Sequence, residues 1–264
     1  MNKKLIRMLS LALAAIMLFS LCSCDTTYDD EKKEIKYASE IPSGKAAIVD
    51  RFNSVLAAAK AEKPAVRFNL GQGTGGCECD NEYVKASFKT VANLITKESF
   101  GVETKFGEDT TDALPVRGTD KAGALAVSDV RTAFITDNKA DDTYTITIKI
   151  NSEANPEQDG STFGKLFKIE KDEEILKNFE NIKHLMTAES YSASYTGGSI
   201  KAVIDKTSDH LVKLELRRDA RIETEVTGHG TLESVGTVPL SFNYNSTEKY
   251  ELDWDNPETT EIED

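Results

Sequence analysis

Residues that usually carry catalysis are scarce in this sequence. Its 264 residues include only three histidines, four cysteines and one tryptophan. His184 lies near the end of a predicted helix, where a cation is favoured, and His210 and His229 lie in predicted turns. Neither a G-x-S-x-G nor an H-E-x-x-H motif occurs. We therefore predict a protein that is not an enzyme, with no catalytic residue, metal site or cofactor; a hydrolase with an unrecognised site is an alternative.

Positive charge is also in short supply. The chain has 32 Lys and Arg against 45 Asp and Glu, a net charge of −13, and loss of residues 1–23 with their three basic residues would make it −16 (−13 − 3). A nucleic-acid partner requires a basic surface, and anionic lipid headgroups attract basic segments. The acidic balance excludes nucleic acid as a partner and argues against binding of the folded surface to anionic lipid.

Long apolar runs are missing except for one, at the start of the chain. Lys3, Lys4 and Arg7 precede an almost wholly apolar run from Met8 to Leu21. This run is shorter than the roughly 20 residues that span a bilayer as a helix. A basic start followed by a short apolar run is typical of a signal peptide.

The end of this run resembles the lipobox, the processing signal of bacterial lipoproteins. In Leu21-Cys22-Ser23-Cys24, the residues Leu21 and Ser23 occupy the −3 and −1 positions relative to Cys24. Cys22 does not fit, because Leu21 would then be at −1. The resemblance implies cleavage after residue 23, diacylglycerol and palmitate on Cys24, and a protein anchored by lipid to the extracytoplasmic face of the cell membrane. A plain secretory peptide is the alternative.

Composition divides the rest of the chain into three parts. Residues 24–41 form the lipidated cysteine and a polar tether, and residues 255–264 form an acidic tail. Between them, residues 42–254 are long enough to bury a sizeable core. We expect one globular domain there, although a division near residues 152–162 is open.

Helical periodicity is present in three segments of this domain. Apolar residues recur there at three- and four-residue spacing. Ser43 would cap the first helix and Pro64 would end it, whereas Asp80 or Asn81 would begin the second. The segments are 47–59, 84–95 and 172–184.

Most of the remaining chain alternates apolar and polar residues, as strands with one buried face do. In residues 211–227, apolar side chains and Arg218 fall on even positions, and charged side chains on odd ones. A strand of this length twists and coils. We predict an α+β fold, with a curved, one-sided antiparallel meander of long strands covered by about three helices. The other strands are expected at 66–70, 143–150, 191–195, 200–204, 238–244 and 250–254, with a turn at Gly197-Gly198.

An exported lipoprotein of this architecture resembles the LolA-like and LppX-like lipid-carrier lipoproteins across residues 40–254. The resemblance implies a cavity between helices and sheet that holds acyl chains. We therefore expect a binding protein that carries an apolar or amphipathic ligand. The alternative is a module with a solid core that binds another envelope protein through its surface. On the carrier hypothesis, Arg218 would face an anionic head group inside the cavity; otherwise it lies at the rim of the sheet or extends its charged end to water.

A glycine-rich segment before the second helix imitates a dinucleotide fingerprint. Gly71, Gly73 and Gly76 satisfy G-x-G-x-x-G after a strand-like segment. However, Glu78 and Asp80 stand where phosphate would bind, and no further βαβ unit follows. We interpret the segment as a flexible loop.

Cys77 and Cys79 are the cysteines that remain once Cys24 is acylated and residues 1–23 are removed. Three states are open for them: a C-x-C disulfide, which closes a small ring, two free thiols, or soft-metal or redox chemistry. Two thiolates make only half a zinc site.

A second motif imitates a calcium loop. Residues 155–160 provide oxygen ligands at positions 1, 3 and 5 and a glycine at position 6, but Leu166 stands at position 12, where a bidentate glutamate is required. We predict an ordinary turn there.

Overall fold

The computed structural model describes residues 39–119, 124–169 and 177–255. The chain divides into two units, residues 1–36 and 37–264, and all the described residues belong to the second. The predicted signal peptide, the lipobox-like sequence with Cys24, most of the predicted tether and the acidic tail beyond Asp255 lie outside the described residues. Within these residues, no helix combines the length and apolar character needed to cross a membrane.

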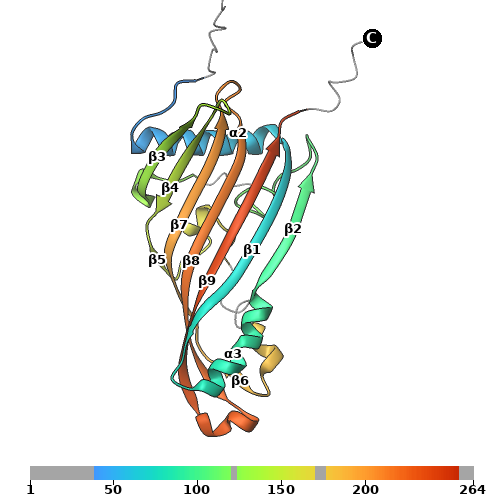
Figure 1. Cartoon of the computed structure of the whole chain (residues 1–264), viewed down its shortest axis with the longest axis vertical. Helices are drawn as coiled ribbons and strands as arrows, with labels where there is room; N and C mark the ends of the chain where they lie inside the picture. Colours follow the sequence, from blue (N-terminus) through green and yellow to red (C-terminus); the bar gives the residue numbers. More distant parts are fainter. Residues whose placement is uncertain (1–38, 120–123, 170–176, 256–264) are drawn as a thin grey trace, which may run out of the picture. The chain divides into compact units, whose positions relative to one another are not determined.

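The fold is α+β, as predicted, and is dominated by one antiparallel sheet (Figure 1). The main order of strands is β2-β1-β9-β8-β7-β4-β3, with the short β5 beside β7 and β6 beside β8. The strands are β1 (Ala65–Glu78), β2 (Lys97–Thr104), β3 (Val130–Asn138), β4 (Thr143–Ile150), β5 (Glu153–Ala154), β6 (Met186–Ala188), β7 (Ser192–Asp205), β8 (Leu211–Gly228) and β9 (Thr237–Asp253).

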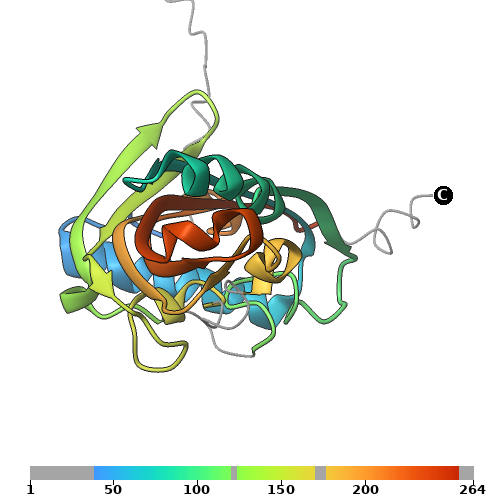
Figure 2. The ribbon, with the colours of Figure 1, turned by 90° about the horizontal axis from the view of Figure 1, so that it is seen from below.

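The long central strands bury one face, as the period of two predicted. From Leu214 to Gly228, the even positions of β8 are buried and the odd positions are not. The start of β8 differs from the predicted alternation. A register shift between β7 and β8 at this point buries Leu211 instead of Val212. Further along, β8 and β9 twist strongly, so that seen from below they curl around their own apolar face (Figure 2).

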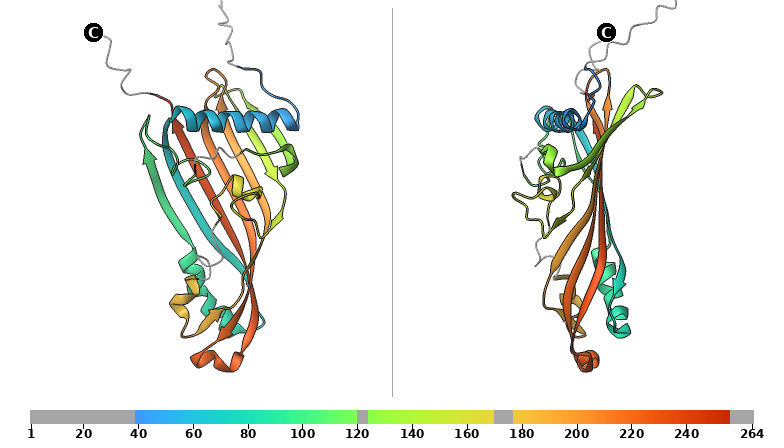
Figure 3. Two further views of the ribbon diagram at one scale, coloured as in Figure 1. Left: turned by 180° about the vertical axis from the view of Figure 1, so that it is seen from behind. Right: turned by 90° about the vertical axis from the view of Figure 1, so that its left-hand side faces the viewer.

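Two α-helices cover opposite ends of this apolar face. Helix α2 (Lys45–Glu62) lies across one end of the sheet, and α3 (Glu82–Ile95) lies near the other end (Figure 3). Asn81 caps α3 by accepting hydrogen bonds from the backbone N–H groups of Tyr83 and Val84. At the centre of this end, the Phe88 ring of α3 lies 4.7 Å from the Phe242 ring of β9. The short helices are η1 (Val127–Asp129), η2 (Phe163–Lys165), η3 (Lys177–Ile182) and η4 (Gly230–Val235).

The prediction of a glycine loop was wrong. Gly71, Gly73 and Gly75 lie within β1 and pair with Thr247, Asn245 and Asn243 of β9. Glycines show no alternation of side chains, so the period that identified the other strands is invisible there. The backbone ladder with β9 nevertheless continues through the segment.

Three further predictions need correction. The expected turn at Gly197-Gly198 is a register shift inside the continuous strand β7, because Gly197 and Gly198 both pair with β8. The predicted strands at 238–244 and 250–254 belong to the single strand β9, which ends at Asp253. Of the third helix, predicted at 172–184, residues 172–176 lie outside the described residues and the rest begins as the 3-10 helix η3. Strands β2 and β3 were not predicted.

Candidate functional site

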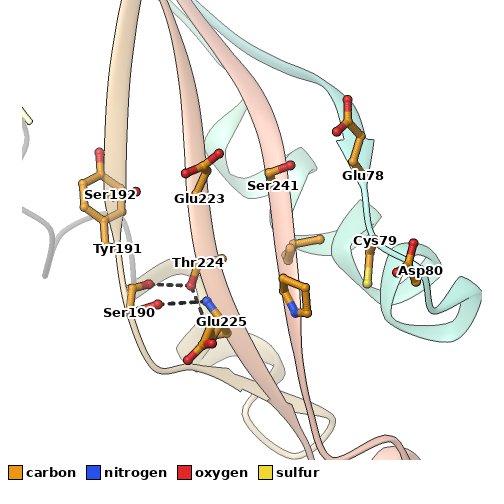
Figure 4. Close-up of a pocket in the computed structure, with 12 residues that line it drawn as sticks. Glu78, Cys79, Asp80, Ser190, Tyr191, Ser192, Glu223, Thr224, Glu225 and Ser241 are labelled. Carbon is orange, nitrogen blue, oxygen red and sulfur yellow. Dashed lines mark hydrogen bonds between the residues drawn. The ribbon is translucent and has the colours of Figure 1, made fainter. Parts of the chain in front are cut away.

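An open pocket of about 440 Å³ lies where β1, β8 and β9 approach the strongly twisted end of the sheet (Figure 4). Its walls come from four segments that are far apart in the sequence. They are Glu78–Asp80, Ser190–Ser192, Glu223–Glu225 and Pro239–Ser241.

The pocket exists because two strands depart from regular pairing beside it. Between β6 and β7, the Glu189 N–H still donates to the Glu225 carbonyl of β8 at 2.8 Å, but Ser190 and Tyr191 leave the regular pairing. The Ser190 carbonyl accepts instead from the Thr224 hydroxyl, and the Ser190 hydroxyl accepts from the Glu225 N–H at 2.9 Å. On the other side, β1 shifts its register against β9 between Gly75 and Glu78. Gly76 has a φ of +58°, a conformation that glycine adopts readily.

The pocket carries more negative than positive charge. Glu78, Asp80, Glu223 and Glu225 line it, and Arg221 is a cation that pairs with two of them. This guanidinium donates to both carboxylate oxygens of Glu78, at 2.6 and 3.3 Å, and lies 3.5 Å from Glu223. The hydrogen bond from Arg221 holds the pKa of Glu78 below its usual value. The remaining carboxylates give the pocket a net negative charge.

Cys77 and Cys79 lie at the edge of this region, and Cys79 lines the pocket. Both side chains are partly buried against the core, and both thiols are free in the structure. Burial, followed by the proximity of Cys79, raises the pKa of the Cys77 thiol. A raised pKa lowers the fraction of nucleophilic thiolate, so this position is poorly suited to thiol catalysis. The disulfide and soft-metal alternatives remain predictions.

Arg218 is the centre of a second polar group, which is buried. The prediction that Arg218 lies at the rim was wrong: it is 3% exposed and belongs to β8, which has three strands of the main sheet on either side. Its guanidinium donates to the Ser246 hydroxyl at 2.8 Å, the Lys168 carbonyl at 3.1 Å and the Tyr244 hydroxyl at 3.3 Å. It also lies 5.2 Å from the centre of the Phe167 ring. The protein's own groups therefore hold this charge in place.

A neighbouring buried charge, that of Glu248, also has its partners within the protein. Glu248 is 2% exposed, accepts a hydrogen bond from the Tyr250 hydroxyl and lies 3.4 Å from the guanidinium of Arg117. Burial raises the pKa of Tyr250 well above its usual value, and the Glu248 carboxylate raises it further. We call the residues Arg117, Arg218, Tyr244, Ser246, Glu248 and Tyr250 the buried polar cluster.

None of the three histidines lines the pocket. The His210 ring stacks on the Trp254 ring with centres 3.8 Å apart. Nε2 of His229 lies 2.9 Å from the Thr187 hydroxyl, and the His229 N–H donates to the Leu185 carbonyl at 2.7 Å. His184 is exposed.

The segment that imitates a calcium loop contains a turn at residues 158–160. The Asn155 side chain accepts a hydrogen bond from the Ala193 N–H at 2.7 Å, and Leu166 is buried in the core. Across the described part of the chain, no three His, Cys, Asp or Glu side chains converge as metal ligands.

Comparison of the chain with protein-family models, with curated proteins and with solved structures returned no match. The resemblance to the LolA-like and LppX-like carriers therefore remains an expectation from the sequence.

Sequence reasoning missed the pocket. The only residues of its walls singled out from the sequence were those of the Cys77–Asp80 region. Glu223 and Glu225 carried no signal, since they are two acids among 45. Only the pairing of β7, β8 and β9 brings them beside Ser190 and Pro239.

Proposed function

We propose that this chain is a lipid-anchored, extracytoplasmic binding protein that engages a positively charged segment of another envelope component at the acidic pocket. The lipobox-like sequence ending at Cys24 supports the lipid anchor and the extracytoplasmic location. The observation that carries the function is the open pocket with its excess of carboxylates.

The chemistry of the pocket suits a lysine or arginine side chain. Asp80, Glu223 and Glu225 offer carboxylates to the charged group. Tyr191 and Pro239 offer apolar surface to the aliphatic stem of the same side chain. A basic segment would approach an acidic protein with favourable long-range electrostatics, most strongly at low salt.

The contacts of Arg218 favour this surface-binding hypothesis over the lipid-carrier hypothesis. Three of the five N–H groups of the guanidinium already donate to the Ser246 hydroxyl, the Tyr244 hydroxyl and the Lys168 carbonyl, so an anionic head group would compete with partners that the fold itself supplies. Displacing the buried Ser246 hydroxyl would leave it without this donor, at a cost of about 1–3 kcal/mol. Surface binding carries no such cost.

The test uses the chain from residue 24 with Cys24→Ser and a fluorescent hexa-arginine peptide as the probe. We expect binding that weakens with salt, and about tenfold weaker binding in the double variant Glu223→Gln/Glu225→Gln. Glu62→Gln/Glu215→Gln removes the same two charges away from the pocket and is the matched control. Equal losses of affinity in both variants would show that the peptide responds to the overall charge of the protein, and would contradict binding at the pocket.

The carrier hypothesis has its own readout on the same material. Solvent extraction and mass spectrometry of the purified protein would detect a stoichiometric lipid if the chain carried one. A bound lipid together with no affinity for the peptide would overturn the surface-binding proposal.

A further inference from the structure

Strand β3 is an open edge of the sheet. Within the described residues it pairs only with β4, so the backbone groups on its other side have no partner strand. At the start of the strand, Nζ of Lys45 donates to the Val130 carbonyl. Figures 2 and 3 show the β3–β4 hairpin leaning away from the other strands.

This edge lacks most of the features that keep open strands from pairing. Natural edges are protected by short length, proline, lysine or a mid-strand bulge. β3 is nine residues long and contains neither proline nor lysine, and its one register shift is at its beginning, between Val130 and Thr132. The regular part from Thr132 to Thr136 is uncharged, and Phe134 in its middle is 49% exposed.

The sequence of β3 is complementary to itself in the antiparallel direction. With Phe134 of two copies opposite each other, Thr132 faces Thr136 and Ala133 faces Ile135, and Arg131, at the register shift that begins the strand, comes level with Asp137. Each of these pairs occurs twice in the symmetric arrangement. Pairs of β-branched residues and of opposite charges are those that stabilise neighbouring strands.

The charges also select this register over its neighbours. A shift that keeps the same faces together moves the centre to Ala133 or to Ile135. Either shift would separate the opposite charges, since the first would place Arg131 at the level of Ile135 and the second would place Asp137 opposite Ala133. The two ion pairs between the copies would then be lost.

Arg131 is available for this role. It is exposed, and no ion pair involving it occurs within residues 39–119, 124–169 and 177–255. Asp137 lies 2.6 Å from Lys206 of its own chain and is 40% exposed. A second guanidinium can therefore reach the open side of this carboxylate.

We propose that two copies of the chain pair through β3, antiparallel and centred on Phe134, and so join their sheets into one. A two-fold axis through Phe134 makes the contact closed, with the same strand contributed by each copy. The contact is small, so its affinity in dilute solution is weak. This inference does not depend on the acidic pocket or its ligand.

The first test is sedimentation equilibrium of the chain from residue 24 with Cys24→Ser, from ~1 to ~200 µM, the range of weak association. We expect a monomer–dimer equilibrium. Arg131→Asp should weaken it at least about tenfold by opposing two acids, and Arg131→Asp combined with Asp137→Arg should restore it. A monomer at every concentration, or no recovery in the double variant, would overturn the proposal.

The second test leaves both charges intact, because Asp137 also pairs with Lys206 and its replacement could weaken the fold. In a background with Cys24, Cys77 and Cys79 replaced by Ser, Phe134→Cys should form a disulfide-linked dimer on mild oxidation, since facing residues in paired strands have Cβ atoms ~4.5–5.5 Å apart. Val102→Cys, on the opposite edge strand β2 and 44% exposed, is the matched control. Equal crosslinking of both variants would contradict pairing through β3, and thermal unfolding checks that every variant is folded.

Discussion

Two arginines three positions apart on β8 belong to two very different regions. Arg218 is 3% exposed and is held by Ser246, Tyr244 and a backbone carbonyl in the buried polar cluster. Arg221 lies on the solvent side and pairs with Glu78 beside the acidic pocket, where carboxylates are in excess. In the first region, the protein's own groups satisfy the charge. In the second, charge is left for something else to bind.

The difference shows that a charged residue on an apolar strand face is not by itself a ligand site. What distinguishes the two regions is whether the partners of the charge come from the same fold. This distinction is open to direct tests on stability.

The largest effect is expected from removing the buried guanidinium. Arg218→Leu should lower the free energy of unfolding by about 3–5 kcal/mol, because it leaves Ser246 and the Lys168 carbonyl without this donor and Tyr244 with Gln72 as its other donor. Arg221→Leu, which removes an exposed ion pair, should lower it much less. Urea denaturation of both variants measures the contrast, and similar losses would contradict the distinction.

A smaller effect of opposite sign is expected at Tyr144, which is 1% exposed but whose hydroxyl has no hydrogen-bond partner among the described residues. Tyr144→Phe should therefore stabilise the protein by about 1 kcal/mol near neutral pH. A gain in stability would show that a buried polar group stabilises this fold only when it has a hydrogen-bond partner, as Arg218 has and the Tyr144 hydroxyl, within the described residues, has not. A loss of stability would show that the hydroxyl has a partner after all.

The same position predicts a pH dependence. Burial raises the pKa of Tyr144 to about 12 from its ordinary 10. The folded state then favours the neutral phenol, so the contribution to stability is complete below pH 10 and is lost as the pH rises towards 12. Denaturation of the natural protein and Tyr144→Phe across this range should show a steeper loss in the natural protein; Tyr250 is present in both and does not affect the difference.

A loss of stability about as large as the gain at Tyr144 is expected at the cap of α3, next to the wall of the pocket. Asn81→Ala removes the acceptor for the N–H groups of Tyr83 and Val84 and should cost about 1 kcal/mol. Asn81→Ser keeps an acceptor and should cost much less. Equal losses on thermal unfolding would show that the cap does not stabilise the pocket region.

The one-sided sheet could be predicted because β8 and β9 alternate buried and exposed residues along almost their whole length. β1 could not, because its glycines lack the side chains that show the period. Arg218 was recognised as unusual from the sequence. Its partners Tyr244 and Ser246 lie on β9 and Lys168 on a distant segment, so only tertiary structure could show that the charge was already satisfied.

The pocket was beyond prediction for the same reason. Four short segments make its walls, and each looks ordinary alone. The open edge at β3 was missed because β3 itself was not predicted as a strand, although the sequence shows the opposite charges of Arg131 and Asp137 near its two ends.

The pairing of β1 with β9 has a consequence for how the chain folds. Ala65 pairs with Asp253, so β1, the first strand of the sheet, lies between β2 and β9, the last of the described strands. Contacts so distant in sequence form late and slowly, because a long loop must close first. During synthesis, the sheet cannot be completed until residues up to Asp253 have left the ribosome.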